Sequence, residues 1–194
     1  MNTIASKAET KSPRKAKLWS AYFFVIAVVI FFDQLTKWMV MEMIMRPAQD
    51  GGMPLSFTEW LLDAPSKLSF MSFEVLPFYN IVMVWNYGVS FGILNNNSAD
   101  NALILIVLAA LISFFLLIWM LDSKSKYVGM ALALAVGGAI GNIIDRARFG
   151  AVIDYIDIHV AGYHWPAFNI ADSCVVLGIG FVIIHSLFFE KKSS

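Results

Sequence analysis

Charged residues are scarce in this sequence. Asp, Glu, Lys and Arg together make up 14% of the 194 residues, whereas a soluble domain contains about a quarter, so the composition excludes an ordinary water-soluble protein. The only cysteine, Cys174, excludes an intrachain disulfide, and its apolar surroundings predict a small buried side chain. The net charge is zero, which leaves no overall attraction for nucleic acid, and we expect no such partner.

Long apolar stretches are what the sequence has instead, since 59% of its residues are hydrophobic. Four stretches are long enough to cross a hydrocarbon core of about 30 Å as helices. They are residues 18–32, with helical character continuing to Val40, residues 102–121, 127–144 and 171–189. The first lacks a cleavage pattern of small residues, which favours an uncleaved span over a signal peptide. The predicted fold class is an all-α membrane protein with four transmembrane helices, built as a single domain over residues 1–194.

The distribution of Lys and Arg predicts the orientation, because cytoplasmic flanks of spans are rich in both. Most of them fall in residues 1–17, 122–126 and 190–194, which four spans place on one side. We therefore expect cytoplasmic tails at 1–17 and 190–194. The extracytoplasmic segment, at about residues 42–94, includes a β-branched and aromatic stretch from 74 to 94 that predicts a small sheet.

The segment of residues 45–73 precedes that sheet and has a mixed composition. It contains Gly, Pro and Ser together with aromatic residues such as Trp60. We expect Trp60 to be exposed at the membrane interface. In that position the segment would gate the site or position a substrate.

Ionisable and amide residues near the ends of the spans are the candidate functional residues, because lipid makes their burial costly. Asp33 and Lys37 are four apart on one helix face and can pair, so a structural ion pair competes with a catalytic role. Asn86 and Gly88 lie just before the second span, in a segment whose alternative interpretation is a simple loop.

A further group of polar residues ends the third span. Gly137 and Gly141 have the spacing that lets two membrane helices approach closely. Asn142, Asp145 and Arg146 follow this packing face, and Asp145 and Arg146 could pair with each other.

Asp154 and Asp172 are the strongest candidates for catalysis. Asp172 alone could simply cap the fourth span. Asp154 lies in the connection between the third and fourth spans, which can fold back and bring it to Asp172. Two carboxylates that share a site do not both ionise readily, so one keeps a proton. Such a pair supplies the acid and the base that activate water against a peptide carbonyl, with no metal and no cofactor.

Five motifs in order, from about Phe32 to the end of the fourth span, resemble the bacterial lipoprotein signal peptidase family, also called signal peptidase II. They are Asp33-Gln34-x-x-Lys37, Asn86-x-Gly88-x-x-Phe91, Gly141-Asn142-x-x-Asp145-Arg146, Val152-x-Asp154-Tyr155 and Phe168-Asn169-x-Ala171-Asp172-Ser173. Tyr155 stands where the family usually has Phe, and residues 45–73 are longer than the usual outer loop.

The resemblance implies an intramembrane aspartic endopeptidase of the bacterial inner membrane with both termini in the cytoplasm. It would cut signal peptides from prolipoproteins just before a diacylglyceryl-modified cysteine, act as a monomer among membrane lipids, and be blocked by globomycin-type cyclic peptides. It implies that the catalytic residues are Asp154 and Asp172. The residues that would bind substrate or support the site are Asp33, Lys37, Asn86, Gly88, Asn142, Asp145, Arg146 and Asn169.

Two other classes of protein compete with this interpretation. Intramembrane carboxylates also mark the ion pathways of small transporters, although those charges usually lie near the middle of the membrane. A non-catalytic assembly factor could use the glycine face for docking, which would leave the carboxylates without a role.

Overall fold

The computed structural model describes residues 13–88 and 98–189. Within these residues, four helical stretches are long and apolar enough to cross a membrane. They are α1 (Pro13–Trp38), which continues through the π-helix η1 (Met39–Met45) and α2 (Arg46–Asp50), then α4 (Ala99–Asp122), α5 (Lys126–Phe149) and α6 (Ile170–Phe189). The four predicted spans are confirmed. The first helix extends further than residue 40. No glycine lies within it before Gly51, whose left-handed backbone conformation ends the helix.

The helix α5 is the centre of the bundle, in contact with α1, α4 and α6. Serine caps start two of these helices, Ser98 at α4 and Ser125 at α5. The predicted close packing at glycine is confirmed: a side chain at Gly137 would meet Val29 of α1, and one at Gly141 would meet Asp33. These glycines let α1 and its buried carboxylate lie directly against α5.

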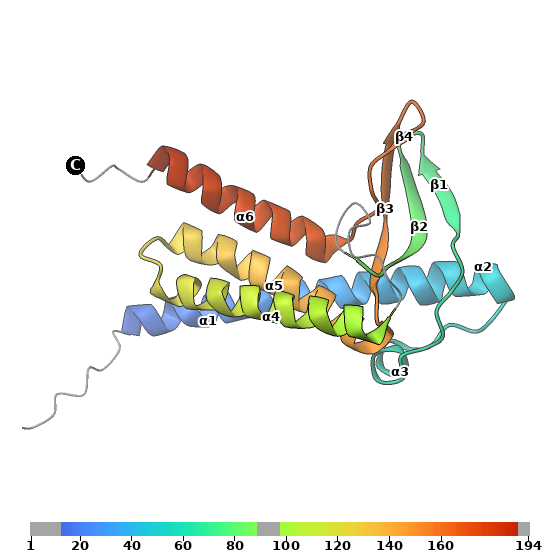
Figure 1. The fold of residues 1–194 in the computed structure, drawn as a ribbon, viewed down its shortest axis with the longest axis horizontal. Coiled ribbons are helices and arrows are strands. Elements are labelled where there is room, and N and C mark those ends of the chain that lie inside the picture. The colour runs from blue at the N-terminus through green and yellow to red at the C-terminus, as the bar shows by residue number, and fades with distance from the viewer. Residues whose placement is uncertain (1–12, 89–97, 190–194) are drawn as a thin grey trace, which may run out of the picture.

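An antiparallel sheet stands at one end of the bundle (Figure 1). Its strands are β1 (Ser72–Leu76), β2 (Tyr79–Asn86), β3 (Val152–Val160) and β4 (Tyr163–His164), in that spatial order. The sheet predicted within residues 74–94 is confirmed for β1 and β2, while positions 89–94 lie outside the described residues. β3 was not predicted, and it pairs with β2 so that Val84 lies opposite Asp154.

The segment of residues 45–73 packs against strand β2 and the end of α5. Its short helix α3 (Phe57–Leu62) begins with a capping box in which Ser56 and Glu59 each bind the other's backbone. The expectation that Trp60 is exposed is wrong, because its side chain is 0% exposed. It packs in a core cluster that includes Met41 of η1 and Phe149 of α5.

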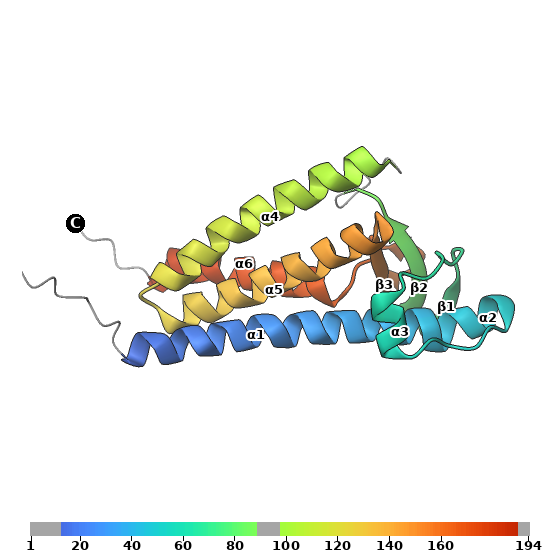
Figure 2. The same ribbon diagram turned by 90° about the horizontal axis from the view of Figure 1, so that it is seen from below.

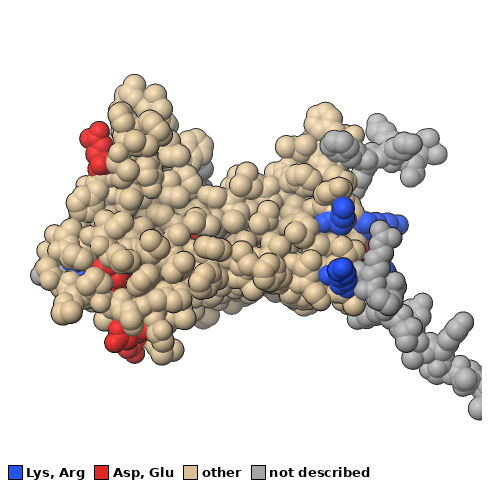
Figure 3. Space-filling view, turned by 180° about the vertical axis from the view of Figure 1, so that it is seen from behind, with Lys and Arg blue, Asp and Glu red and all other residues tan. Residues whose placement is uncertain are grey.

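The charge of the surface changes along the long axis of the molecule. α1 begins and α6 ends at one end, which also carries the connection between α4 and α5, and the sheet lies at the other (Figures 1 and 2). Lys and Arg gather at the first end, Asp and Glu near the sheet, and the zone between is almost free of charge (Figure 3). That zone exposes large apolar side chains of α4 and α6, such as Phe115 and Leu177. Cys174, expected to be buried, is only half-buried on α6.

Candidate active site

A cavity of about 990 Å³ opens where the sheet meets the start of α6. Much of its wall is apolar, including Trp165 and Phe168 before α6 and Val176 and Leu177 on it. Its wall also includes six predicted site residues: Asn86, Gly88, Asn142, Arg146, Asp154 and Asp172. The structure therefore brings together residues from β2, α5, β3 and α6 that are far apart in the sequence.

Asp154 lies on β3 and is 1% exposed. Its Oδ1 accepts a hydrogen bond from Asn169 Nδ2 at 2.8 Å, and its Oδ2 accepts one from Asn86 Nδ2 at 2.9 Å. Burial, together with the nearby charge of Asp172, raises the pKa of Asp154 well above the usual range of an aspartate, and these two hydrogen bonds only partly oppose the shift. Asp154 is thus suited to hold a proton near neutral pH.

Asp172 lies in the first turn of α6, where it closes a reciprocal cap with Asn169. The Asp172 N–H donates to Asn169 Oδ1 at 2.8 Å, and the Asn169 N–H donates to Asp172 Oδ2 at 3.2 Å. Asn142 Nδ2 donates to the other carboxylate oxygen at 2.7 Å. Asp172 is therefore both a helix cap and a neighbour of Asp154, and Asn169 connects the two carboxylates because its side-chain amide donates to Asp154 and its backbone N–H donates to Asp172.

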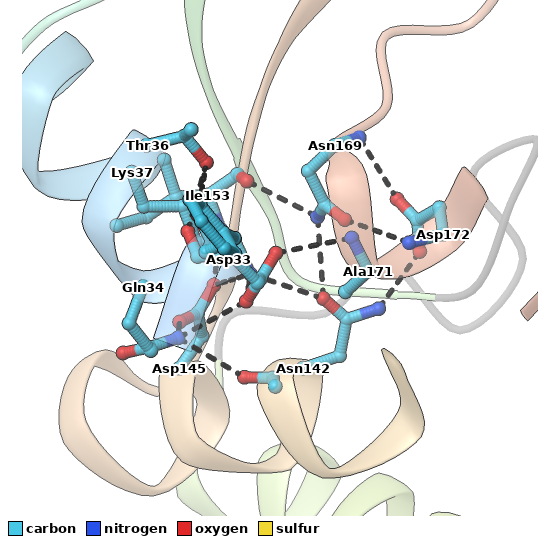
Figure 4. A network of polar contacts seen from close by, with 12 residues as sticks. Asp33, Gln34, Thr36, Lys37, Asn142, Asp145, Ile153, Asn169, Ala171 and Asp172 are labelled. Atoms are coloured by element: carbon cyan, nitrogen blue, oxygen red, sulfur yellow. Dashed lines mark hydrogen bonds and ion pairs between the residues drawn. The ribbon is translucent and has the colours of Figure 1, made fainter. Parts of the chain in front are cut away.

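Behind the cavity lies an ion triad formed by Asp33, Lys37 and Asp145 (Figure 4). Lys37 Nζ is 2.8 Å from Asp33 Oδ2 and 2.7 Å from Asp145 Oδ2, and all three side chains are 0% exposed. The predicted pair of Asp33 and Lys37 is confirmed. The suggested pair of Asp145 and Arg146 is replaced by the bond to Lys37, because adjacent residues on a helix point in different directions.

The triad is connected to the backbone beside both cavity aspartates. Asp33 Oδ1 accepts from the N–H of Ala171 at 3.0 Å, and Asp145 Oδ2 accepts from the N–H of Ile153 at 3.1 Å. Ala171 immediately precedes Asp172, and Ile153 immediately precedes Asp154. The buried carboxylates thus fix the backbone on which the cavity carboxylates are carried, although they do not line the cavity themselves.

Asn142 joins the two sets of residues. Its Oδ1 accepts from Lys37 Nζ at 3.3 Å and from Asn169 Nδ2 at 3.2 Å, which leaves its Nδ2 for Asp172. Arg146 stabilises the turn after β2, since its Nη2 donates to Gly88 O at 2.8 Å. In that turn the Gly88 N–H donates to Asn86 Oδ1 at 3.0 Å, so Asn86 Nδ2 points to Asp154.

Sequence reasoning did not select Gln34 as a site residue. Its Nε2 donates to Asp145 Oδ1 at 2.9 Å and to Asp33 Oδ2 at 3.2 Å, and its side chain is 3% exposed. The available signal was its place between Asp33 and Lys37, where a polar residue in an apolar helix is costly unless it has partners.

The fold and the site define a multi-pass membrane protein whose candidate active site is an aspartate pair at the ends of its spans. Two solved structures described as a bacterial membrane enzyme share this fold. One matches with a TM-score of 0.66 and 27% identity over 90% of this chain and 94% of its own. The other has a TM-score of 0.64 and 28% identity over 89% and 95%.

Sequence relatives place the chain more narrowly. A protein of Francisella tularensis named lipoprotein signal peptidase is 38% identical over 71% of this chain and 86% of its own length. One with the same name from Methylobacterium radiotolerans is 36% identical over 74% and 88%. The family model described as signal peptidase (SPase) II matches residues 25–188. This chain belongs to the signal peptidase II family and is a peptidase.

Proposed function

We propose that this protein removes signal peptides from diacylglyceryl-modified prolipoproteins, cutting just before the lipidated cysteine, with Asp154 and Asp172 as the catalytic pair. The family and the names of its relatives support the substrate class. The observation that carries the mechanism is that two aspartates share one cavity and, within the described residues, are held by amides with no ion pair to either. Acid–base catalysis by such a pair requires carboxylates that can change protonation.

In this mechanism the two aspartates take different roles. Asp154, whose pKa is raised by burial and by Asp172, carries the proton. The Asp172 carboxylate accepts two hydrogen bonds, from Asn142 Nδ2 and from the backbone N–H of Asn169, and is the carboxylate that takes a proton from the attacking water. Asp154 gives its proton to the scissile carbonyl oxygen as the tetrahedral intermediate forms. When the intermediate collapses, the leaving amine takes up the proton held by Asp172, and the hydroxyl proton of the intermediate returns to Asp154 as the carbonyl re-forms.

The cavity suits a substrate that is partly lipid. The apolar residues Val176 and Leu177 line it on α6, whose neighbouring surface is exposed and apolar. A diacylglyceryl chain held there would stay in contact with lipid while the peptide bond reaches the aspartates. Globomycin-type cyclic peptides are expected to compete for the same cavity.

We also propose that the protein lies in the bacterial inner membrane with both termini in the cytoplasm and the cavity near the outer face. Lys and Arg gather at the end where α1 begins, away from the sheet (Figure 3), as expected for the cytoplasmic side. A cysteine introduced at position 124 should be labelled only after cells are permeabilised. Labelling from outside intact cells would reverse this orientation.

The function is tested by single-turnover cleavage of a purified lipid-modified prolipoprotein by Asp154→Asn and Asp172→Asn. Each variant keeps the size of the side chain but cannot exchange the proton, so we expect the rate to fall by at least about 10²–10⁴-fold. The matched control is Asp157→Asn, also on β3 but outside the cavity, where the carboxylate binds Asn80 and His164. Near-normal cleavage by either cavity variant would exclude the pair.

A further inference from the structure

Arg148, in the last turn of α5, occupies the boundary between the segment of residues 45–73 and the ion triad. The centre of its guanidinium lies 4.1 Å from the ring centroid of Trp60 and 4.5 Å from that of Phe149. Its Nη2 donates to the backbone oxygen of Trp60, and its Nη1 lies 3.4 Å from Gln34 Oε1. A planar guanidinium can stack on rings and donate at its edge at the same time.

The contact between Arg148 and Gln34 requires one orientation of the Gln34 amide. Its Nε2 faces Asp33 and Asp145, which accept hydrogen bonds and offer none when ionised. Its Oε1 must then face the other way, towards Arg148, which only donates. Arg148 therefore fixes the amide that aligns both carboxylates of the triad.

These contacts form a continuous connection to the catalytic pair. From Arg148 it passes through Gln34 to Asp33 and Asp145, and each of these holds one backbone N–H. Those two N–H groups belong to the residues just before Asp172 and Asp154. Among the described residues, none of the segment 45–73 lines the cavity. The segment touches the cavity wall through Leu68, whose backbone oxygen accepts from Trp85 Nε1, whereas the connection through Arg148 leads to the backbone beside both aspartates.

We propose that Arg148 is a positioning residue for the cleavage reaction: clamped by Trp60 of the segment 45–73, it aligns Gln34 and the buried carboxylates, and so sets the spacing of Asp154 and Asp172. This inference depends on the proposed catalytic pair. Under this proposal the segment 45–73 supports the geometry of the site through Arg148. This role differs from the gating or substrate positioning expected from its composition.

A second ion pair in the same segment provides a matched control. Arg46 binds Glu42 through two hydrogen bonds at 2.6 and 2.8 Å, and Glu42 also accepts the N–H of Leu55. Both arginines anchor the segment 45–73, but the hydrogen bonds of Glu42 lead to Arg46 and to the backbone of Leu55, whereas those of Arg148 lead to Trp60 and Gln34. Loss of Arg46 should therefore lower stability without changing the chemistry.

The experiment compares Arg148→Met with Arg46→Met by measuring kcat, KM and the pH profile of cleavage. A small misplacement of catalytic groups costs up to about 10²-fold, and for Arg148→Met we expect a loss of about 10-fold in kcat with KM within about 2-fold. When the aspartates separate, the pKa of Asp154 falls towards its ordinary value, so the alkaline limb of the profile should move to lower pH. Arg46→Met should keep the wild-type kcat and profile.

Two further variants cover the case in which Arg148→Met does not fold. Arg148→Lys keeps the cation, but one ammonium cannot bind both Trp60 O and Gln34 Oε1, so it should show the same shift in smaller degree. Adding Gln34→Met to Arg148→Lys should then lower kcat no further than Gln34→Met alone. A wild-type pH profile in Arg148→Lys, or equal kcat in Arg148→Met and Arg46→Met, would overturn the proposal. Asp154→Asn in the same assay separates this failure from failure of the catalytic pair itself.

Discussion

Four aspartates meet at this site, and they form two pairs that differ in what neutralises them. Asp33 and Asp145 share Lys37, which lies within 2.8 Å of both. Asp154 and Asp172 are held only by amide and backbone donors within the described residues. The first pair therefore has a cation at ion-pair distance, whereas the second, the proposed catalytic pair, has none among the described residues.

The comparison teaches that a carboxylate in an apolar environment acquires its role from its partners. A cation at ion-pair distance favours the ionised form of an aspartate, and an ionised carboxylate is a strong acceptor for a backbone N–H. Amide partners hold an aspartate in place without fixing its charge, which is what acid–base chemistry requires. The ion-paired carboxylates hold the backbone beside the proposed catalytic pair, since the N–H groups of Ile153 and Ala171 belong to the residues just before the cavity aspartates.

The largest expected effect on stability is that of Lys37→Met. It leaves two carboxylates buried at 0% exposure without their cation, and removing one partner of a buried ion pair costs about 3–5 kcal/mol. We expect little folded protein, and a marked loss of thermal stability in detergent for the fraction that folds.

The control for this prediction is Lys124→Met at the exposed α4–α5 connection, which should change stability by less than about 0.5 kcal/mol. Adding Asp145→Asn to Lys37→Met removes one uncompensated charge and should restore part of the stability. If Lys37→Met were as stable as Lys124→Met, the triad would not hold a fixed charge and the contrast between the two pairs would disappear.

The sequence was sufficient to predict the four spans and most of the polar residues of the site, Gln34 excepted. Length and apolarity mark the spans, and a polar side chain in such a setting is conspicuous because it is costly. The connection that brings Asp154 to Asp172 was also foreseen as a topological consequence. What remains a prediction is the catalytic role of this pair.

Features that depend on distant partners could not be predicted. β3 was missed because its strand character comes from pairing with β2, which is separated from it by two spans. The partner of Asp145 is Lys37 on another helix, and local sequence offered only its neighbour Arg146. Trp60 is buried because Arg148 and Phe149 pack on it, and no local pattern announces such contacts.

The smallest expected effect concerns Tyr155, which is next to Asp154 on β3. Its side chain contacts α1 and does not enter the cavity. Neighbouring residues of a strand point to opposite faces, and the Tyr155 hydroxyl, whose pKa is raised by burial to about 12, donates to Thr36 Oγ1 of α1 at 2.8 Å.

Tyr155→Phe should therefore lower stability by about 0.5–1.5 kcal/mol, the usual net contribution of one hydrogen bond, and leave the single-turnover rate within about 2-fold of wild type. A double-mutant cycle with Thr36→Val in detergent should give a coupling of similar size, because each change removes the same bond. A loss of cleavage above about 10-fold at unchanged stability would move Tyr155 from the support to the reacting groups. Tyr155 would then belong with Asp154 to the groups that take part in the reaction, and no longer to the residues that only support them.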